Sequence, residues 1–235
     1  MLLKVNKSLN FSKKARTLRA ICYLIIHYSG MQSGRVSMDR LKNPKSKVSC
    51  HYFIERNGNI FRMVEDDKIA WHAGKSKWKD LKNLNKHSIG IEIQNKGHSF
   101  NYQSFTKKQI LSLIKLIKIL MKKYKIKKRN ILGHSDIAPL RKLDPGEKFP
   151  WNFLSKKGVA IWYPENKLKA DDIEIKSMRK IFFRNIYKIG YRFFSLSKKS
   201  NKDRKIIMAF QRRFLPNEVN GKITKKTLKI SQLLA

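Results

Sequence analysis

The chain has 235 residues, of which 41% are hydrophobic, and this is enough to bury a substantial core in one large or two unequal domains. Its net charge of +38 would suit a nucleic-acid-binding protein. However, residues 1–160 carry 35 basic and 10 acidic side chains, and residues 161–235 carry 19 basic and 6 acidic ones. Because the positive charge is spread evenly along the chain, it argues against a specific nucleic-acid partner. Two cysteines without repeated spacing do not make a disulfide framework, and no apolar stretch is long enough for a transmembrane helix.

The first predicted element is a buried strand at residues 21–28, an apolar run rich in β-branched and aromatic residues. It ends at His27, and functional groups often lie at the ends of elements on a rigid scaffold. Taken alone, a histidine such as His27 at the end of a strand is more often a structural residue than a ligand. A hairpin follows, because the apolar runs 51–55 and 60–64 flank an Asn-Gly turn.

A second strand with a possible functional residue is predicted at residues 88–94. It carries one carboxylate, Glu92, among isoleucines. A charge in this setting is costly unless it is paired, bound to a metal or catalytic. The alternative is that Glu92 lies at a sheet edge and faces water.

Residues 106–123 are predicted to form an amphipathic helix. Thr106 caps it and Gln109 completes a capping box. The lysines between the apolar positions form its solvated face. Strands interleaved with helices indicate an α/β domain around a central sheet. The buried stripe of the helix comprises Ile110, Leu113, Ile114, Ile117 and Leu120 or Met121.

Residues 133–146 form the most informative stretch of the chain. This segment is too rich in proline and glycine for a regular helix. In extended backbone Lys142 and Asp144 project to the same side, and the Pro-Gly pair that follows turns the chain away. An ammonium and a carboxylate directed at one point, with His134 nearby, suggest a metal site with an electrostatic helper.

The C-terminal part of the chain has a different, helical pattern. Residues 151–164 close the first domain, which we predict to span residues 1–164, and the polar residues 165–172 are predicted to be a linker. Residues 173–235 then form a small domain. Its three predicted helices cover residues 173–191, 203–214 and 224–234, separated by Gly190 and Asn220-Gly221.

Together these segments resemble the zinc-dependent N-acetylmuramoyl-L-alanine amidases of the amidase-2 family, in the branch that turns over or recycles murein. The phage T7-type branch of this family places a cysteine where this chain has Asp144. The resemblance covers roughly residues 20–155 and implies a mixed central sheet. It rests on Ile25-Ile26-His27-Tyr28, Val48 to Ile54, Ala70-Trp71-His72-Ala73-Gly74, Ser88 to Glu92, and Gly133 to Gly146.

The resemblance implies a complete site for hydrolysis of the amide bond between N-acetylmuramic acid and L-alanine. It implies His27, His134 and Asp144 as ligands of one Zn²⁺, with Glu92 and Lys142 as the catalytic pair. The substrate is expected to be peptidoglycan or a muropeptide, and the enzyme is expected to be a monomer. Residues expected to contact the substrate from a loop are Trp71, His72 and Ala73.

The remaining histidines receive separate predictions. His51 is expected to line or support the cleft or to be purely structural, and the same alternatives apply to His72. His87 and His98 are predicted to be surface residues. Cys50 is given no chemical role.

The predicted C-terminal helices resemble a three-helix peptidoglycan-binding module. The resemblance rests on Ile189-Gly190-Tyr191, residues 209–214, Val219-Asn220-Gly221 and residues 224–227. The chain departs from that pattern at Ser195–Ser200, which replaces an acidic glycine-containing turn. The alternative is that these helices only pack against the first domain.

Two other questions stay open from the sequence. A metal-free protein that binds peptidoglycan without cleaving it is the main rival to an enzyme, although it would have no need of Glu92 and Lys142 together. The lysine-rich first twenty residues show no secretory signal, which favours the cytoplasm, whereas a murein-binding tail favours the cell envelope.

Overall fold

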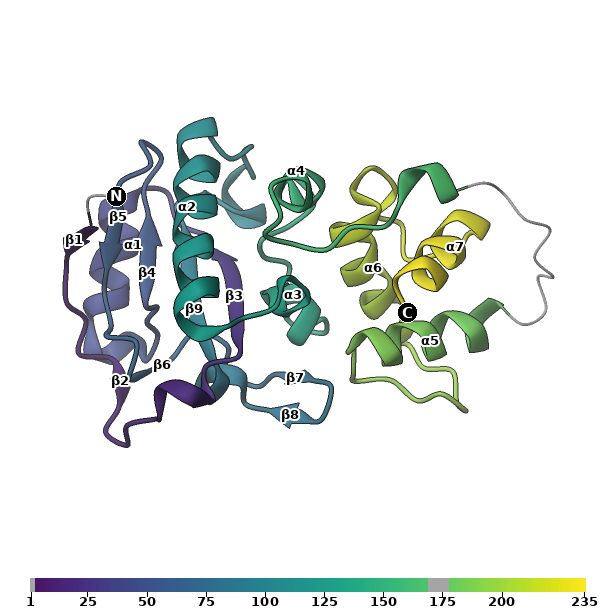
Figure 1. Ribbon diagram of the computed structural model, residues 1–235, viewed down its shortest axis with the longest axis horizontal. Helices are drawn as coiled ribbons and strands as arrows, with labels where there is room; N and C mark the ends of the chain where they lie inside the picture. The colour runs from purple at the N-terminus through teal and green to yellow at the C-terminus, as the bar shows by residue number, and fades with distance from the viewer. Residues whose placement is uncertain (1–2, 169–177) are drawn as a thin grey trace.

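A six-stranded mixed sheet forms the centre of the computed structural model, which describes residues 3–168 and 178–235 (Figure 1). Strand β5 runs antiparallel to β4, and every other neighbouring pair in this sheet is parallel. The predicted mixed α/β architecture is therefore confirmed. In spatial order the strands are β1 (Leu3–Val5), β5 (Ile60–Arg62), β4 (Tyr52–Ile54), β9 (Ser88–Ile93), β3 (Tyr23–Tyr28) and β10 (Ile131–Gly133).

The remaining short elements connect the strands of this sheet or flank it. Two antiparallel pairs, β2 with β6 and β7 with β8, lie outside it. The β4–β5 hairpin closes where the sequence predicts it, with the Glu55 N–H donating to the Asn59 carbonyl at 3.0 Å. The short strands are β2 (Phe11–Ser12), β6 (Ile69–Ala70), β7 (Lys77–Trp78) and β8 (Leu81–Lys82), and the 3-10 turns are η1 (Leu18–Ala20), η2 (Pro44–Ser46), η3 (Leu84–His87), η4 (His98–Phe100), η5 (Lys128–Asn130), η6 (Glu165–Lys167) and η8 (Pro216–Glu218).

Helix α2 (Lys107–Tyr124) covers one face of the sheet (Figure 1). The predicted capping box is present: Thr106 Oγ1 accepts from the Gln109 N–H at 3.1 Å, and Gln109 Oε1 accepts from the Thr106 N–H at 3.0 Å. The predicted apolar stripe is buried in one cluster with the sheet. The other helices of this part are α1 (Gly34–Lys42), α3 (His134–Ile137) and α4 (Trp151–Lys156).

The strand alternation decides which side chains face α2. Leu24 and Ile26 of β3 belong to the α2 cluster, as do the isoleucines of β9. The residues that alternate with these along each strand, including His27 and Glu92, therefore project to the opposite face of the sheet. On that face α1 packs over Phe53 of β4, so the polar residues collect between α1 and the C-terminal helices.

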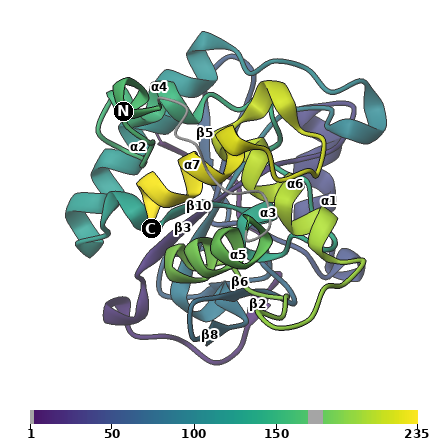
Figure 2. The same cartoon turned by 90° about the vertical axis from the view of Figure 1, so that its right-hand side faces the viewer.

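Among the described residues of the C-terminal region there are three α-helices (Figure 2): α5 (Met178–Ile189), α6 (Asp203–Phe214) and α7 (Lys225–Leu234). These bounds confirm the predicted helices at 203–214 and 224–234. The first part of the predicted helix 173–191 and the end of the predicted linker lie outside the described residues.

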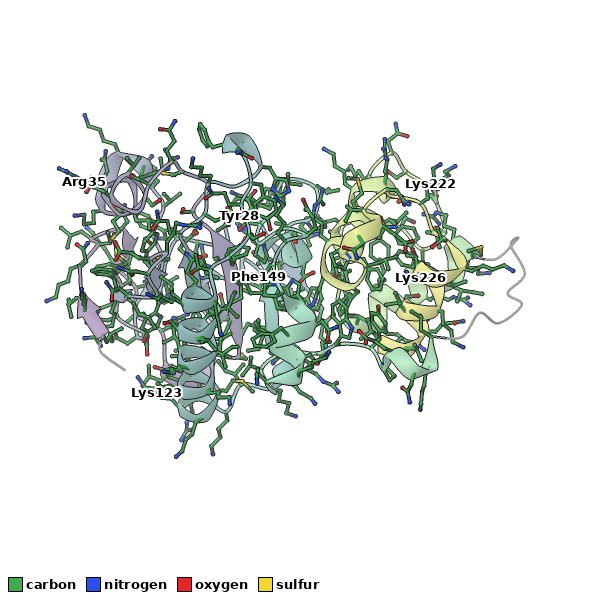
Figure 3. The ribbon with its side chains drawn as sticks, turned by 90° about the horizontal axis from the view of Figure 1, so that it is seen from above. Tyr28, Arg35, Lys123, Phe149, Lys222 and Lys226 are labelled. Atoms are coloured by element: carbon green, nitrogen blue, oxygen red, sulfur yellow. The ribbon has the colours of Figure 1, made fainter. Side chains whose placement is uncertain are left out.

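The C-terminal helices share an apolar cluster with the sheet. The cluster joins Ile25 of β3 to Phe182 of α5 and Phe210 of α6, all fully buried. Figure 3 shows Tyr28 and Phe149 near the middle of the molecule, with Lys222 and Lys226 towards the end formed by the C-terminal helices. Within the described ranges no helix is long and apolar enough to cross a membrane.

Candidate active site

Three potential metal-binding side chains converge at one end of the sheet. His27 Nδ1 lies 2.9 Å from His134 Nδ1, and Asp144 Oδ2 lies 3.0 Å from each of these nitrogens. All three residues are buried. The structure thus brings together the three residues that the family resemblance singled out as ligands.

The parallel pairing of β3 and β10 explains why the two histidines meet. Ile26 is the register partner of Gly133, so the next residue of each chain segment, His27 and His134, leaves the sheet at the same edge. The chain then returns, and the Ser135 N–H donates to the Asp144 carbonyl at 2.8 Å. This contact places the Asp144 carboxylate against both imidazoles.

The segment after β10 is more helical than predicted. Residues 134–137 form one helical turn, α3, because the Asp136 carboxylate accepts from the Gly133 N–H at 2.8 Å and caps it. The irregular backbone expected from the prolines and glycines begins only at Ala138. His134 is the first residue of this turn.

In both His27 and His134, the Nε2 atom, which points away from the cluster, has a hydrogen-bond acceptor of its own. His27 Nε2 lies 3.1 Å from His72 Nδ1, and His72 Nε2 lies 3.3 Å from Ser88 Oγ. Since the Ser88 hydroxyl donates to the Leu84 carbonyl at 2.6 Å, each earlier group in the series must donate to the next. The His27 proton therefore sits on Nε2, which leaves the Nδ1 lone pair directed at the cluster.

His134 is oriented in the same way by backbone. Its Nε2–H donates to the Ala73 carbonyl at 3.1 Å, so its Nδ1 is also free to act as a ligand. Burial, reinforced by the neighbouring His134, lowers the pKa of His27 to about 4, so its ring is neutral at pH 7. Two neutral imidazoles and one carboxylate fit the ligand set of catalytic zinc.

Glu92 lies beside this cluster on the adjacent strand. It is the register partner of His27, and its Oε2 is inaccessible and without a hydrogen-bond partner among the described residues. Burial, and then the charge of Asp144, raise the pKa of Glu92 well above its usual value, while Lys142 opposes the shift. A buried carboxylate oxygen without a partner is costly in a purely structural role.

A cavity of about 590 Å³ opens onto these groups. Glu92, His134, Lys142 and Asp144 border it, so the side chains of Lys142 and Asp144 do face one site. The half-buried Trp71 also borders the cavity and is held by its indole N–H, which donates to Ser12 Oγ at 3.1 Å.

The three residues expected to contact substrate occupy different places. Trp71 and His72 border the cavity, but His72 is only 8% exposed and is committed to His27 and Ser88. Ala73 is fully buried and does not border the cavity. Its carbonyl accepts from His134, and a contact of Ala73 with substrate stays a prediction.

His98 was missed as a site residue, since the sequence predicted it at the surface. It is only half-exposed and borders the cavity. Its Nδ1 lies 2.8 Å from the Tyr28 hydroxyl, its Nε2 lies 3.1 Å from Glu147 Oε2, and its ring stacks on Tyr102. Tyr28 and Glu147 are far from His98 in the chain, so no local pattern indicated these two partners.

His51 supports the site from beneath. It is fully buried, and its Nδ1 accepts from the Gly90 N–H at 2.9 Å. Its ring also meets the edge of His72, with 5.6 Å between ring centroids. His51 therefore holds β9 and His72 in place rather than lining the cavity.

Comparison with known proteins identifies the class to which this fold and site belong. The chain belongs to the Amidase_2 family, described as N-acetylmuramoyl-L-alanine amidase, whose profile matches residues 17–147. Among relatives, it is 32% identical over 231 residues to N-acetylmuramoyl-L-alanine amidase AmiD of Escherichia coli, covering 90% of this chain and 81% of that protein. It is 45% identical over 106 residues to 1,6-anhydro-N-acetylmuramyl-L-alanine amidase AmpD of Haemophilus influenzae, covering 45% of this chain and 55% of that protein.

Solved structures give the same result along most of the chain. A complex of E. coli AmiD with the substrate anhydro-N-acetylmuramic acid-L-Ala-D-γ-Glu-L-Lys superposes with a TM-score of 0.82 at 30% identity, covering 95% of this chain and 91% of that one. AmpDh3 of Pseudomonas aeruginosa, in complex with an anhydromuramic pentapeptide, has a TM-score of 0.82 at 27% identity, with 95% and 93% covered. The similarity therefore includes the C-terminal helices.

Proposed function

We propose that this chain is a zinc-dependent amidase that hydrolyses the bond between N-acetylmuramic acid and L-alanine in peptidoglycan or muropeptides. The observation that carries the proposal is the convergence of three ligand atoms, two of them on imidazoles whose Nε2–H groups already have acceptors. His27 and His134 would hold zinc through Nδ1 and Asp144 through Oδ2. Because the structures of AmiD and AmpDh3 contain anhydromuramyl peptides, an anhydro-muropeptide is the first substrate to test.

Bound zinc supplies Lewis acidity, which polarises a carbonyl and lowers the pKa of water. Glu92 is the general base: its carboxylate takes a proton from the attacking water and gives it to the departing L-alanine nitrogen. The water oxygen bonds to the amide carbon as the carbon–nitrogen bond breaks. The products are a muramic acid carboxylate and a peptide with a free amino terminus.

Lys142 supplies the positive charge at the reacting carbonyl. Its ammonium borders the same cavity as Glu92 and stabilises negative charge on the amide oxygen as water adds. Arg40 and Arg141 also border the cavity, and their charge suits the carboxylates of an acidic muropeptide. Trp71 offers the substrate an apolar surface.

The C-terminal region carries a separate proposal. We keep the predicted division into a catalytic domain of residues 1–164, a linker of residues 165–172 and a peptidoglycan-binding-like domain of residues 173–235. The apolar cluster that joins these helices to β3 supports a close association of the two domains. Binding of murein by the C-terminal helices remains a prediction.

Product analysis tests the proposed reaction. The purified protein is incubated with zinc and an anhydro-muropeptide, and the products are identified by mass. We expect the free peptide and anhydro-N-acetylmuramic acid, together heavier than the substrate by one water. Glu92→Gln, which conserves shape, is the matched control and should yield almost no product. A zinc-loaded wild-type protein that binds the muropeptide without cleaving it would support the metal-free binding rival instead.

A further inference from the structure

Two consecutive arginines of α6 hold the two ends of the chain segment that carries His134 and Asp144. Arg213 forms a buried ion pair with Asp136, two residues after His134. Arg212 lies with its Nε 3.7 Å from Glu147 Oε2, three residues after Asp144. The C-terminal region thus contacts the segment just beyond each of the two ligands.

The contact at Asp136 is fully internal. This carboxylate is 1% exposed, and it accepts from the Gly133 N–H and from the Tyr191 hydroxyl at 2.5 Å, in addition to Arg213. Arg213 is itself 3% exposed and also donates to the Ile131 carbonyl at 2.9 Å. The guanidinium therefore fixes both the helical turn that begins at His134 and the strand that precedes it.

The helical turn α3 depends on such external contacts. A four-residue helix is too short to be stable alone, because nucleation of the first turn is unfavourable. Figure 1 shows α3 between the sheet and the C-terminal helices, and α3 contacts α6 directly. If Arg213 is removed, Asp136 becomes a buried charge without its main partner, and the turn must shift to rehydrate it. His134 would move with that turn.

We propose that α6 is a positioning element for the metal ligands, acting through Arg213, with Tyr191 and Arg212 in support. This inference rests on the proposed zinc function. Arg213 touches neither the ligand atoms nor the cavity described above, so its effect is exerted through Asp136 and His134. The C-terminal region is then part of the catalytic unit, whether or not it also binds murein.

Zinc affinity of an Arg213→Met variant tests the proposal directly. The full-length protein is titrated with zinc against a chromophoric chelator, and turnover of an anhydro-muropeptide is measured in parallel. We expect zinc binding to weaken by roughly 10-fold, the lower end of the cost of losing a direct outer partner of a ligand, because Arg213 acts on His134 only through Asp136. At saturating zinc, kcat should fall while KM changes little, because the cavity wall that meets the substrate is intact.

Arg179→Met is the control, because it removes another arginine that is paired with a buried aspartate within the C-terminal region. Arg179 Nη2 lies 2.7 Å from Asp203 Oδ2, and Asp203 is 6% exposed. This pair contacts neither α3 nor the ligands, so the variant should lose stability but keep its zinc affinity and kcat. Equal effects of the two variants on zinc affinity would overturn the proposal, since they would reflect general destabilisation.

Tyr191→Phe provides a milder test if Arg213→Met does not fold. It removes only the hydroxyl that donates to Asp136, and the expected loss of zinc affinity is roughly 2- to 10-fold, as for one hydrogen bond. Unchanged zinc affinity and kcat in folded Tyr191→Phe, or in folded Arg213→Met, would overturn the inference. A wild-type protein that binds no zinc would instead overturn the proposed function on which the inference rests.

Discussion

A single methyl group added at Gly90 should weaken zinc binding without touching a ligand. A Cβ at this position would lie 2.3 Å from Cγ of His72, whereas ordinary contact begins at 3.4 Å, so the ring must move by about 1.1 Å. The hydrogen bond between His27 Nε2 and His72 Nδ1 is 3.1 Å long, and beyond about 3.5 Å it is lost. The N–H of His27 would then be buried without an acceptor.

The size of the effect follows from this lost partner. A buried N–H donor that has lost its acceptor costs about 1–3 kcal/mol. Loss of an outer partner of a metal ligand costs roughly 10- to 100-fold in affinity, or about 1.4–2.7 kcal/mol. The two ranges agree, so we expect Gly90→Ala to bind zinc about 10- to 100-fold more weakly than wild type.

Competition with a chelator, on protein shown to be folded by circular dichroism, measures this change. Gly158→Ala is the control, because it also adds one methyl group, at a φ of +77° that strains the backbone but with open space around it. Its zinc affinity should equal that of wild type. Wild-type affinity in folded Gly90→Ala would refute the role assigned to the His27–His72 contact.

Three further predictions concern catalysis and binding. Glu92→Gln should keep zinc but lose roughly two to four orders of magnitude in turnover, and Lys142→Ala roughly two to three, so near wild-type turnover in either would disprove its role. Burial, and then the charge of Asp144, raise the pKa of Glu92 in the zinc-free protein, so an NMR titration of that protein should find Glu92 still protonated at a pH where exposed glutamates are already ionised; ionisation of Glu92 together with the exposed glutamates would contradict this. If residues 173–235 bind murein through a groove, the full-length protein should still sediment with murein at about 0.5 M salt, where exposed charges are screened, whereas loss of binding there would indicate charge-driven adhesion alone.

Much of the fold was predictable because its signals are local. The isoleucines that alternate with His27 and Glu92 marked two buried strands and the face on which the polar groups meet. The Asn-Gly turn and the Thr106 capping box likewise act within a few residues of sequence. The structure then brings His27, His134 and Asp144 together as the family resemblance implied, and their role as zinc ligands stays a prediction.

The outer partners of the site were not predictable from the sequence. His98 pairs with Tyr28 and Glu147, which are 70 and 49 residues away in the chain, and Arg213 reaches Asp136 across 77 residues. Such contacts produce no periodic pattern. In a chain with 54 lysines and arginines, nothing local distinguishes the buried guanidinium of Arg213 from the many solvated cations around it.

The burial of Ala73 was hidden for a related reason. A loop with tryptophan and histidine beside alanine predicts exposure, but the backbone carbonyl of Ala73 is what His134 needs as an acceptor. Backbone hydrogen bonds do not depend on the side chain, so the residue type gave no indication of this contact.

Removal and return of zinc tests the central claim most directly. The wild-type protein is stripped with a chelator, dialysed, and assayed on an anhydro-muropeptide by mass before and after zinc is added in equimolar amount. We predict that the stripped protein is inactive and that one zinc per chain restores activity in wild type but not in His134→Ala. Full cleavage by the metal-free protein would contradict the account.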